Sequence, residues 1–168
     1  CGGVSSVTGA NFLVEINKEQ GIKRLLVDCG MEQGSDHAKV YNRSPFIFDP
    51  KDIDILLITH AHMDHIGLIP KLVKHGFKGV IYSTPETRDL SVFMLEDALK
   101  LITQEADHEK VDPIYEANDV KRAFDLWKTI PYHKDFDLFR DMDVSVYLKD
   151  AGHILGSAMF EIRIPLNN

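Results

Sequence analysis

The stretch Thr59–Pro70, THAHMDHIGLIP, places three histidines and an aspartate within six consecutive positions. The run before it, Ile53–Ile58, is short, rich in β-branched residues and bounded by charge, which predicts a buried strand that ends at Thr59. In an α/β sheet the carboxyl end of a strand opens onto the crevice where ligands bind. Imidazole and carboxylate are ligands of zinc and other divalent transition metals, so this density of both predicts a metal site. The alternative is a polar loop with incidental histidines, which a single histidine would favour but three with a carboxylate do not.

The four candidate ligands of this stretch come in two pairs. His60 and His62 are two positions apart and are expected to project together from an extended loop. Asp64 and His65 follow at once, where the apolar spacing becomes helical, and the helix is expected to continue to about Lys74. The two pairs are therefore expected to face one cavity from two directions.

A fifth candidate ligand, His153, stands in DAGHILGSAMF, a glycine-bracketed turn between two expected strands, 143–148 and 158–164. Glycines allow backbone conformations that aim a side chain into a site. A lone histidine is a structural residue as often as a ligand, but beside the first stretch His153 is the best candidate for a third imidazole. Three histidines with one open position are typical of a catalytic zinc site.

Asp28 ends an expected strand just before Cys29 and Gly30. It is either a simple turn-former or an acceptor behind the ligands that holds a ligating imidazole in one tautomer, and we favour the second interpretation. Thr59, at the end of the strand before the histidines, is assigned to the same supporting group. Cys29 is expected to be a small buried residue rather than a reactive thiol, and with Cys1 it makes no disulfide framework.

The composition is that of a globular chain of 168 residues, 44% hydrophobic, which can bury the core of a single domain. No apolar run approaches membrane-spanning length and no secretory signal opens the chain, so we expect a cytoplasmic protein with no membrane partner. The formal net charge of −7 argues against nucleic-acid binding through general basicity. It is compatible with a phosphodiester substrate, because a pair of divalent ions brings positive charge to a cleft.

Strands and helices alternate along the rest of the chain, which predicts the α/β class. Antiparallel strands are expected over 11–17 and 22–28, a long loop over 32–52, and a strand over 79–83. Thr84 is expected to cap a long helix that begins at Pro85. The apolar spacing assigns to the inner face of that helix Leu90, Phe93, Met94, Ala98, Leu101 and Ile102.

A third helix is expected to begin at Asn118 or Asp119 and to run through Trp127, with Val120, Phe124 and Trp127 as its inner stripe. Polar surroundings predict that the remaining histidines lie on the surface: His37, His75, His108 and His133. Thr8 and Ser157 stand near glycines and either touch a substrate phosphate or cap turns; we favour the turns.

Taken together, these segments resemble a known family. THAHMDHIG resembles the HxHxDH signature of the metallo-β-lactamase fold, VDCG its first motif and DAGHILGSAMF its third. The flanking text, including VTGANFLVE, VDCGMEQG and YSTPETRDL, is similar to the β-CASP branch, the RNA-processing nucleases related to the endonuclease subunit of the cleavage and polyadenylation factor. The likeness covers essentially residues 1–168 and implies an αββα sandwich, of which this chain is the amino-terminal half.

The resemblance implies that His60, His62 and His153 bind one zinc, and that Asp64 and His65 bind a second and are the catalytic pair of the site. Asp28 would support the histidine loop. A hydroxide shared by the two ions would attack phosphorus in an RNA substrate.

The family pattern also has parts that this chain does not match. Its fourth motif, an aspartate that bridges both metals, and its fifth, a histidine of the second site, are expected beyond the last residues given, and the inserted β-CASP domain is missing. We therefore expect one zinc and no finished active site in this chain. An open sheet edge and exposed apolar faces would favour a homo-oligomer or association with the missing half.

Two other functions stay open on the sequence. One is another hydrolase of the same fold, acting on a thioester or a lactone, which would share HxHxDH but not usually the segment after it. The other is a non-catalytic fragment or binding subunit. The intact ligand set argues against a long-degenerate relative.

Overall fold

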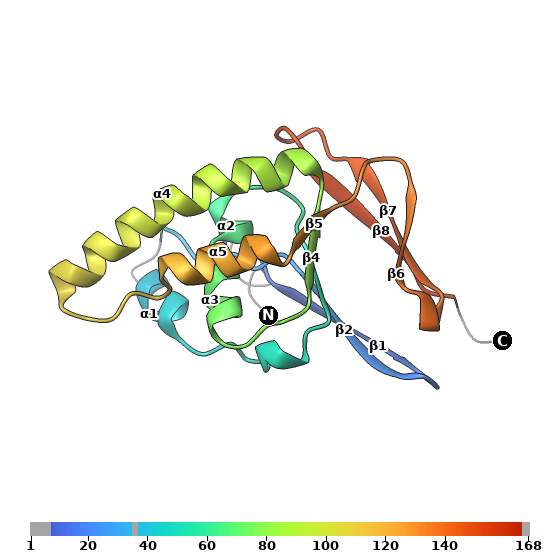
Figure 1. Cartoon of the computed structure of the whole chain (residues 1–168), viewed down its shortest axis with the longest axis horizontal. Helices are drawn as coiled ribbons and strands as arrows, with labels where there is room; N and C mark the ends of the chain where they lie inside the picture. Colours follow the sequence, from blue (N-terminus) through green and yellow to red (C-terminus); the bar gives the residue numbers. More distant parts are fainter. Residues whose placement is uncertain (1–7, 35–36, 166–168) are drawn as a thin grey trace.

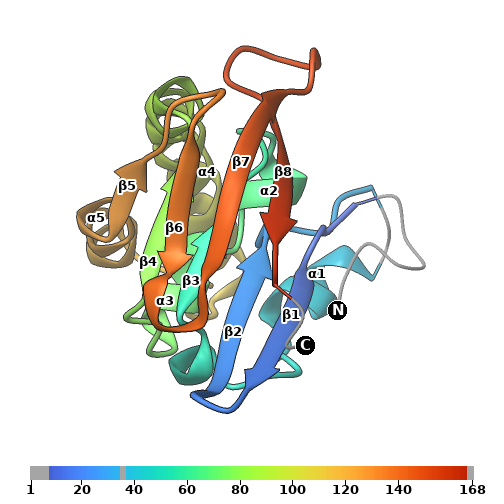
Figure 2. The same ribbon diagram turned by 90° about the vertical axis from the view of Figure 1, so that its right-hand side faces the viewer.

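Two β-sheets pack face to face, and helices cover the outer face of the larger sheet, in the computed structural model, which describes residues 8–34 and 37–165 (Figure 1). The five-stranded sheet has the order β1 (Phe12–Lys18), β2 (Gly21–Val27), β3 (Ile55–Leu57), β4 (Val80–Ser83) and β5 (Trp127–Thr129). The three-stranded sheet has the order β6 (Asp135–Phe139), β7 (Val144–Asp150) and β8 (Ala158–Arg163), and Figure 2 shows it in front of the first. The predicted α/β class is confirmed.

Five α-helices and two 3-10 turns connect the described strands. They are α1 (Ala38–Arg43), η1 (Pro50–Asp52), α2 (Met63–Ile66), α3 (Ile69–Lys74), α4 (Pro85–Glu109), α5 (Ala117–Asp125) and η2 (Arg140–Met142). Among the residues that the structure describes, no helix is long and apolar enough to cross a bilayer.

The sheet topology brings three loops of the chain to one edge. β1 and β2 form the expected antiparallel hairpin, and β2, β3, β4 and β5 run parallel, with Val27 beside Leu57 and Leu57 beside Tyr82. Parallel strands have their carboxyl ends at the same edge. The residues that follow β2, β3 and β4 therefore gather there, and these segments begin with Asp28, Ile58 and Thr84.

Apolar side chains fill the two spaces between the layers. One core lies between the five-stranded sheet and the helices, and the other lies between the two sheets. The side chains of β3 are all buried, because Leu56 belongs to the first core and Ile55 and Leu57 to the second. Burial on both faces explains why the sequence of this strand is an unbroken apolar run.

The segment 32–52, expected to be a loop, contains α1 and η1. No apolar period marks α1, and its contacts are with residues distant in sequence. The Asn42 side chain accepts from the Glu32 amide at 2.8 Å and donates to the Glu32 carbonyl at 2.9 Å, while the buried Lys71 ammonium donates to the Asn42 and Ser44 carbonyls. Tertiary hydrogen bonds thus hold a helix that the local sequence does not indicate.

The helix expected after the histidine loop ends at Lys74 as predicted, but it is divided into α2 and α3. The Leu68 amide donates to the Cys29 carbonyl at 2.9 Å, and the Asp64 carbonyl accepts from Ala10 at 2.8 Å. The hydrogen bond from Leu68 to Asp64 that would continue one helix is therefore replaced by two bonds to other segments.

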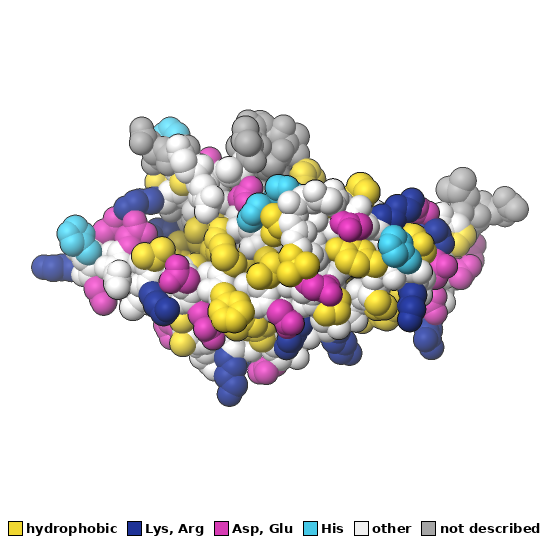
Figure 3. All heavy atoms as spheres, turned by 90° about the horizontal axis from the view of Figure 1, so that it is seen from above, with side chains coloured by type: hydrophobic (Ala, Val, Ile, Leu, Met, Phe, Trp, Pro, Cys, Tyr) yellow, Lys and Arg dark blue, Asp and Glu magenta, His cyan; other side chains and the backbone are white. Residues whose placement is uncertain are grey.

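The inner face of α4 is not the predicted one, although Thr84 caps the helix as expected. Its buried residues are Thr87, Ser91, Leu95, Ile102 and Ala106, so only Ile102 of the expected set lies fully inside. Phe93 and Leu101 are 71% and 62% exposed, and Met94 is also exposed. Figure 3 shows hydrophobic side chains gathered across the face of the molecule on which α4 lies. The prediction failed because two inward positions carry small hydroxyl residues.

α5 begins earlier than predicted. Its N-cap is Glu116, which forms a capping box with Asp119, so Asn118 and Asp119 lie inside the first turn. The helix ends at Asp125, and Trp127 opens β5 instead of closing the helix; its indole donates to the Ser83 hydroxyl at 2.9 Å. β5 and β6 were not expected from the sequence.

Paired charges line the outer face of the three-stranded sheet. Glu161 pairs with Lys149 at 2.5 Å and with Arg163 at 2.9 Å, and Arg163 also pairs with Asp135 and lies over the Tyr147 ring. No helix of the described residues covers this face. Association through the sheet edge stays a prediction.

Gly30 is the closest approach between the end of β2 and α2. A Cβ added to it would lie 1.6 Å from the Asp64 carbonyl oxygen, which is backbone and fixed by its bond to Ala10. We expect Gly30→Ala to lower the free energy of unfolding by about 3 kcal/mol or more through overpacking, measured by urea denaturation. The control is Gly34→Asn, where no described residue apart from its chain neighbours lies within 4 Å of an added Cβ and asparagine tolerates the positive φ. Equal stability of the two variants would contradict this close approach.

Candidate metal centre

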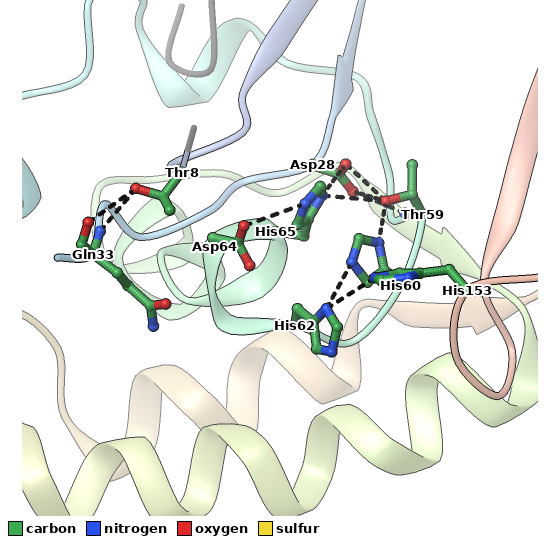
Figure 4. A network of polar contacts seen from close by, with 9 residues as sticks. All are labelled: Thr8, Asp28, Gln33, Thr59, His60, His62, Asp64, His65 and His153. Atoms are coloured by element: carbon green, nitrogen blue, oxygen red, sulfur yellow. Dashed lines mark hydrogen bonds and ion pairs between the residues drawn. The ribbon is translucent and has the colours of Figure 1, made fainter. Parts of the chain in front are cut away.

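Three histidine rings converge at the carboxyl edge of the sheet (Figure 4). His60 follows β3, His62 is the N-cap residue of α2, and His153 comes from the loop between β7 and β8. The His62 Nδ1 atom lies 3.1 Å from His60 Nε2 and 3.2 Å from His153 Nε2, and the three ligand atoms lie within 4.8 Å of one another. The structure thus brings together two segments 91 positions apart in the sequence.

These distances fit a single tetrahedral metal. Two nitrogens bound at about 2.0–2.1 Å with a tetrahedral angle between them lie roughly 3.3 Å apart. Burial differs across the cluster: His60 is buried, His62 is intermediate and His153 is exposed. An ion held here would be covered by protein on the His60 side and accessible from the His153 side, as a site with an open position requires.

The protonation of His60 suits a ligand. Burial, followed by the neighbouring rings of His65, His62 and His153, lowers the pKa of His60 to about 4. The ring is therefore neutral at pH 7. A neutral imidazole has one nitrogen with a free lone pair, which is the form that binds metal.

A chain of hydrogen bonds selects which nitrogen of His60 is free. The Thr59 hydroxyl donates to Asp28 Oδ2 at 2.8 Å, so it accepts from His60 Nδ1, which lies 2.9 Å away. With its proton on Nδ1, His60 directs the bare Nε2 toward His62 and His153. The Thr59 amide also donates to Asp28 Oδ1 at 2.8 Å. Asp28 and Thr59 thus lie behind His60, and their role in supporting a metal ligand stays a prediction.

The same carboxylate orients His65. His65 Nδ1 lies 2.7 Å from Asp28 Oδ2, and its Nε2 lies 3.6 Å from Asp64 Oδ2. Burial alone would lower the pKa of His65, but the hydrogen bond and the charge of Asp28 outweigh it and raise that pKa. Asp64 and His65 therefore present two ligand atoms beside the triad. Within the described part of the chain they do not belong to a set of three metal-binding groups.

The other residues singled out in the sequence lie away from the triad or support its loops. Thr8 pairs with the Gln33 backbone, on the side of Asp64 away from the histidines in Figure 4. The Ser157 hydroxyl accepts from the His153 and Ile154 amides at 3.1 and 3.2 Å, so it caps a turn as expected.

The residues predicted to lie outside the site do so. His37, His75, His108 and His133 are all exposed. Cys29 is fully buried, and burial raises the pKa of its thiol, which agrees with an unreactive residue. Cys1 lies outside the described residues.

Sequence reasoning missed the buried hydroxyls of Thr84 and Thr87, which bond to the loop of His153. The segment TPET was interpreted only as a helix start. The one available signal was the second threonine, which a helix cap does not require.

The role of Thr59 in orienting His60 is testable. Thr59→Val keeps the shape of the side chain but removes the link between Asp28 and His60, so we expect affinity for a divalent metal to fall roughly tenfold or more. The measurement is metal titration against a chromophoric chelator. The control is Thr103→Val, which removes an exposed hydroxyl of α4 bonded to the Leu99 carbonyl. Unchanged affinity in Thr59→Val would mean that the tautomer of His60 is set by something else.

Comparison with known proteins identifies the family of the chain. The model of the metallo-β-lactamase superfamily domain matches residues 13–168. Ribonuclease TTHA0252 of Thermus thermophilus is 38% identical over 157 residues, covering 94% of this chain and 32% of the relative. Transcription termination factor FttA of Methanosarcina mazei is 36% identical over 170 residues, covering 97% of this chain and 24% of the relative. The chain thus spans about a third or less of the length of these relatives.

The fold also matches a solved structure. MEM-A1, a subclass B3 metallo-β-lactamase from a soil metagenome library, superposes with a TM-score of 0.50 and 16% sequence identity, covering 96% of this chain and 58% of that one. This likeness concerns the fold alone. On the match over residues 13–168, the chain belongs to the metallo-β-lactamase superfamily.

Proposed function

We propose that this chain is the metal-binding part of a zinc-dependent, RNA-processing nuclease of the β-CASP type, which hydrolyses phosphodiester bonds. The observation that carries the proposal is the ligand arrangement: the triad of His60, His62 and His153 stands beside the pair of Asp64 and His65. Relatives named as a ribonuclease and a transcription termination factor support the choice of RNA as the substrate class.

The triad would hold the first ion, and Asp64 with His65 would contribute to a second. Zinc suits three imidazoles with one open position. When bound, such ions lower the pKa of a coordinated water toward neutrality and polarise a phosphoryl oxygen.

The protein groups behind the ligands orient the ligating rings. Asp28 and Thr59 keep Nε2 of His60 free of its proton, and Asp28 holds Nδ1 of His65, which fixes the direction of that ring. One carboxylate thus fixes a ring in each half of the site. Because both rings depend on the same group, the two halves are oriented together.

Charge favours a substrate that binds through the metal. The chain carries a net charge of −7, so its surface as a whole repels a polyanion. A divalent ion on the triad would place positive charge at the exposed side of His153. RNA binding should therefore depend on metal loading.

The first test is metal content. After exposure to excess zinc and removal of weakly bound ions, elemental mass spectrometry should give at most one zinc per chain, because the triad is the only set of three metal-binding groups among the described residues. We expect His153→Ala to lower zinc affinity by more than about 100-fold, since loss of a ligand should exceed the loss caused by a supporting residue. The matched control is His133→Ala, an exposed histidine outside the cluster. Two tightly held zincs, or unchanged affinity in His153→Ala, would contradict this site.

The second test concerns RNA. We expect a fluorescent RNA oligonucleotide to bind the zinc-loaded chain and not the metal-free chain, and binding to be lost in His62→Ala but kept in His133→Ala. Fluorescence anisotropy measures this. Equal binding with and without zinc would contradict binding through the metal, and no binding in either state would contradict RNA as the substrate class. We expect no cleavage of RNA by this chain, because the second ligand set is incomplete; cleavage abolished by His62→Ala would overturn that expectation and support the nuclease assignment.

A further inference from the structure

Two buried hydroxyls at the start of α4 bond to one carbonyl of the loop that carries His153. The Thr84 and Thr87 side chains are fully buried, and their Oγ1 atoms lie 2.6 and 2.8 Å from the Gly156 carbonyl oxygen. Figure 1 shows the loop between β7 and β8 beside the end of α4 where the helix begins. The two segments are 69 and 72 positions apart in the sequence.

The two hydroxyls and the carbonyl form a small network. The Thr84 hydroxyl oxygen accepts from the Thr87 amide at 3.2 Å, which is the helix cap, and its proton lies within reach of the Gly156 carbonyl at 2.6 Å and of the Thr87 hydroxyl oxygen at 3.0 Å. The Thr87 hydroxyl donates to the same carbonyl. Gly156 has φ +82°, and a Cβ added to it would lie 2.5 Å from the Thr87 amide nitrogen. Glycine therefore allows the backbone to approach the helix this closely.

Hydrogen bonds within the loop connect Gly156 to the backbone of His153. The Ser157 hydroxyl accepts from the His153 and Ile154 amides, the Ser157 amide donates to the Ile154 carbonyl at 3.0 Å, and the Ser157 carbonyl accepts from Ala151 at 3.0 Å. These bonds close the turn on itself between residues 151 and 157. Displacing Gly156 would therefore displace the backbone of His153 with it.

His153 depends on its backbone more than His60 does. His60 has Thr59 and Asp28 behind it, whereas the contacts of the exposed His153 ring within the described residues are with the rings of His60 and His62. Their centroids lie 4.8 and 5.0 Å from that of His153. The position of this ring thus follows from the position of its loop.

We propose that Thr84 and Thr87 are positioning residues for metal binding: their hydroxyls, named here the hydroxyl clamp, hold the Gly156 carbonyl so that His153 reaches the ion. This inference rests on the proposed metal site and extends it to residues that touch neither metal nor substrate. A hydroxyl pair used only to satisfy a buried helix end would have no effect on metal affinity, which separates the two roles.

The test is the zinc dissociation constant of the chain, measured by competition with a chromophoric chelator. Thr87→Val removes one hydroxyl at nearly constant volume, and we expect it to weaken zinc binding roughly tenfold. Thr87→Ser restores a hydroxyl and should restore affinity. The matched control is Ser91→Ala, which removes a buried hydroxyl one turn later that donates to the Thr87 carbonyl at 2.7 Å. It should lower the melting temperature and leave zinc affinity unchanged.

A double-mutant cycle with His153→Ala locates the effect. If the clamp acts through His153, Thr87→Val should cause no further loss of affinity in the His153→Ala chain. An equal loss in both backgrounds, or wild-type affinity in Thr87→Val, would overturn the clamp. If Thr87→Val does not show a cooperative melt, Thr87→Ala replaces it, and we expect the same loss of zinc affinity. Failure of the proposed metal site can be told apart from failure of the clamp alone. If the wild-type chain binds no zinc, or if His153→Ala binds zinc normally, the metal site is wrong, and no threonine variant is needed to show it. Either result would overturn the clamp as well.

Discussion

The carboxylate of Asp28 is the group on which the rest of the site depends. It is almost fully buried, at the end of β2, in a left-handed backbone conformation with φ 59°. Its oxygens accept from the Thr59 amide, the Thr59 hydroxyl and the His65 ring. A buried charge is costly unless it is hydrogen-bonded, and here every bond goes to the segment that begins with the histidine loop. The interaction that satisfies the charge is therefore the same one that sets the direction of the ligands.

Parallel strand order makes that interaction possible. Because β2 and β3 are neighbours with matching ends, the residue after β2 lies against the residues after β3, and β4 adds Thr84 at the same edge. The second sheet contributes from the other side: the Ala158 amide at the start of β8 donates to the Thr59 carbonyl at 2.8 Å. The ligands of the triad thus come from two sheets, and Thr59 bonds to both of them at this edge.

Much of this arrangement could be predicted from the sequence, where local chemistry and tertiary structure agree. The apolar run before Thr59 marks a strand buried on both faces, and the histidine spacing marks the cluster, although the metal-binding role of each residue stays a prediction. The failures share a cause. α1 is held by Asn42 and Lys71 through contacts with backbone elsewhere in the chain, and Thr87 lies on the inner face of α4, where its hydroxyl bonds to the Gly156 loop. Hydrophobic periodicity does not register polar residues that are buried by a partner elsewhere in the chain.

The charged outer face of β6, β7 and β8 has a consequence for colloidal behaviour. Lys149, Glu161, Arg163 and Asp135 alternate in sign across neighbouring strands, with side chains that remain partly exposed to water. Stacking a second sheet on this surface would strip water from all four ions, so the face resists sheet-on-sheet aggregation although no helix of the described residues covers it. Salt screens exposed ion pairs over a distance of about 8 Å at physiological ionic strength. The cost of removing water from these ions therefore opposes burial of this face more than long-range repulsion does.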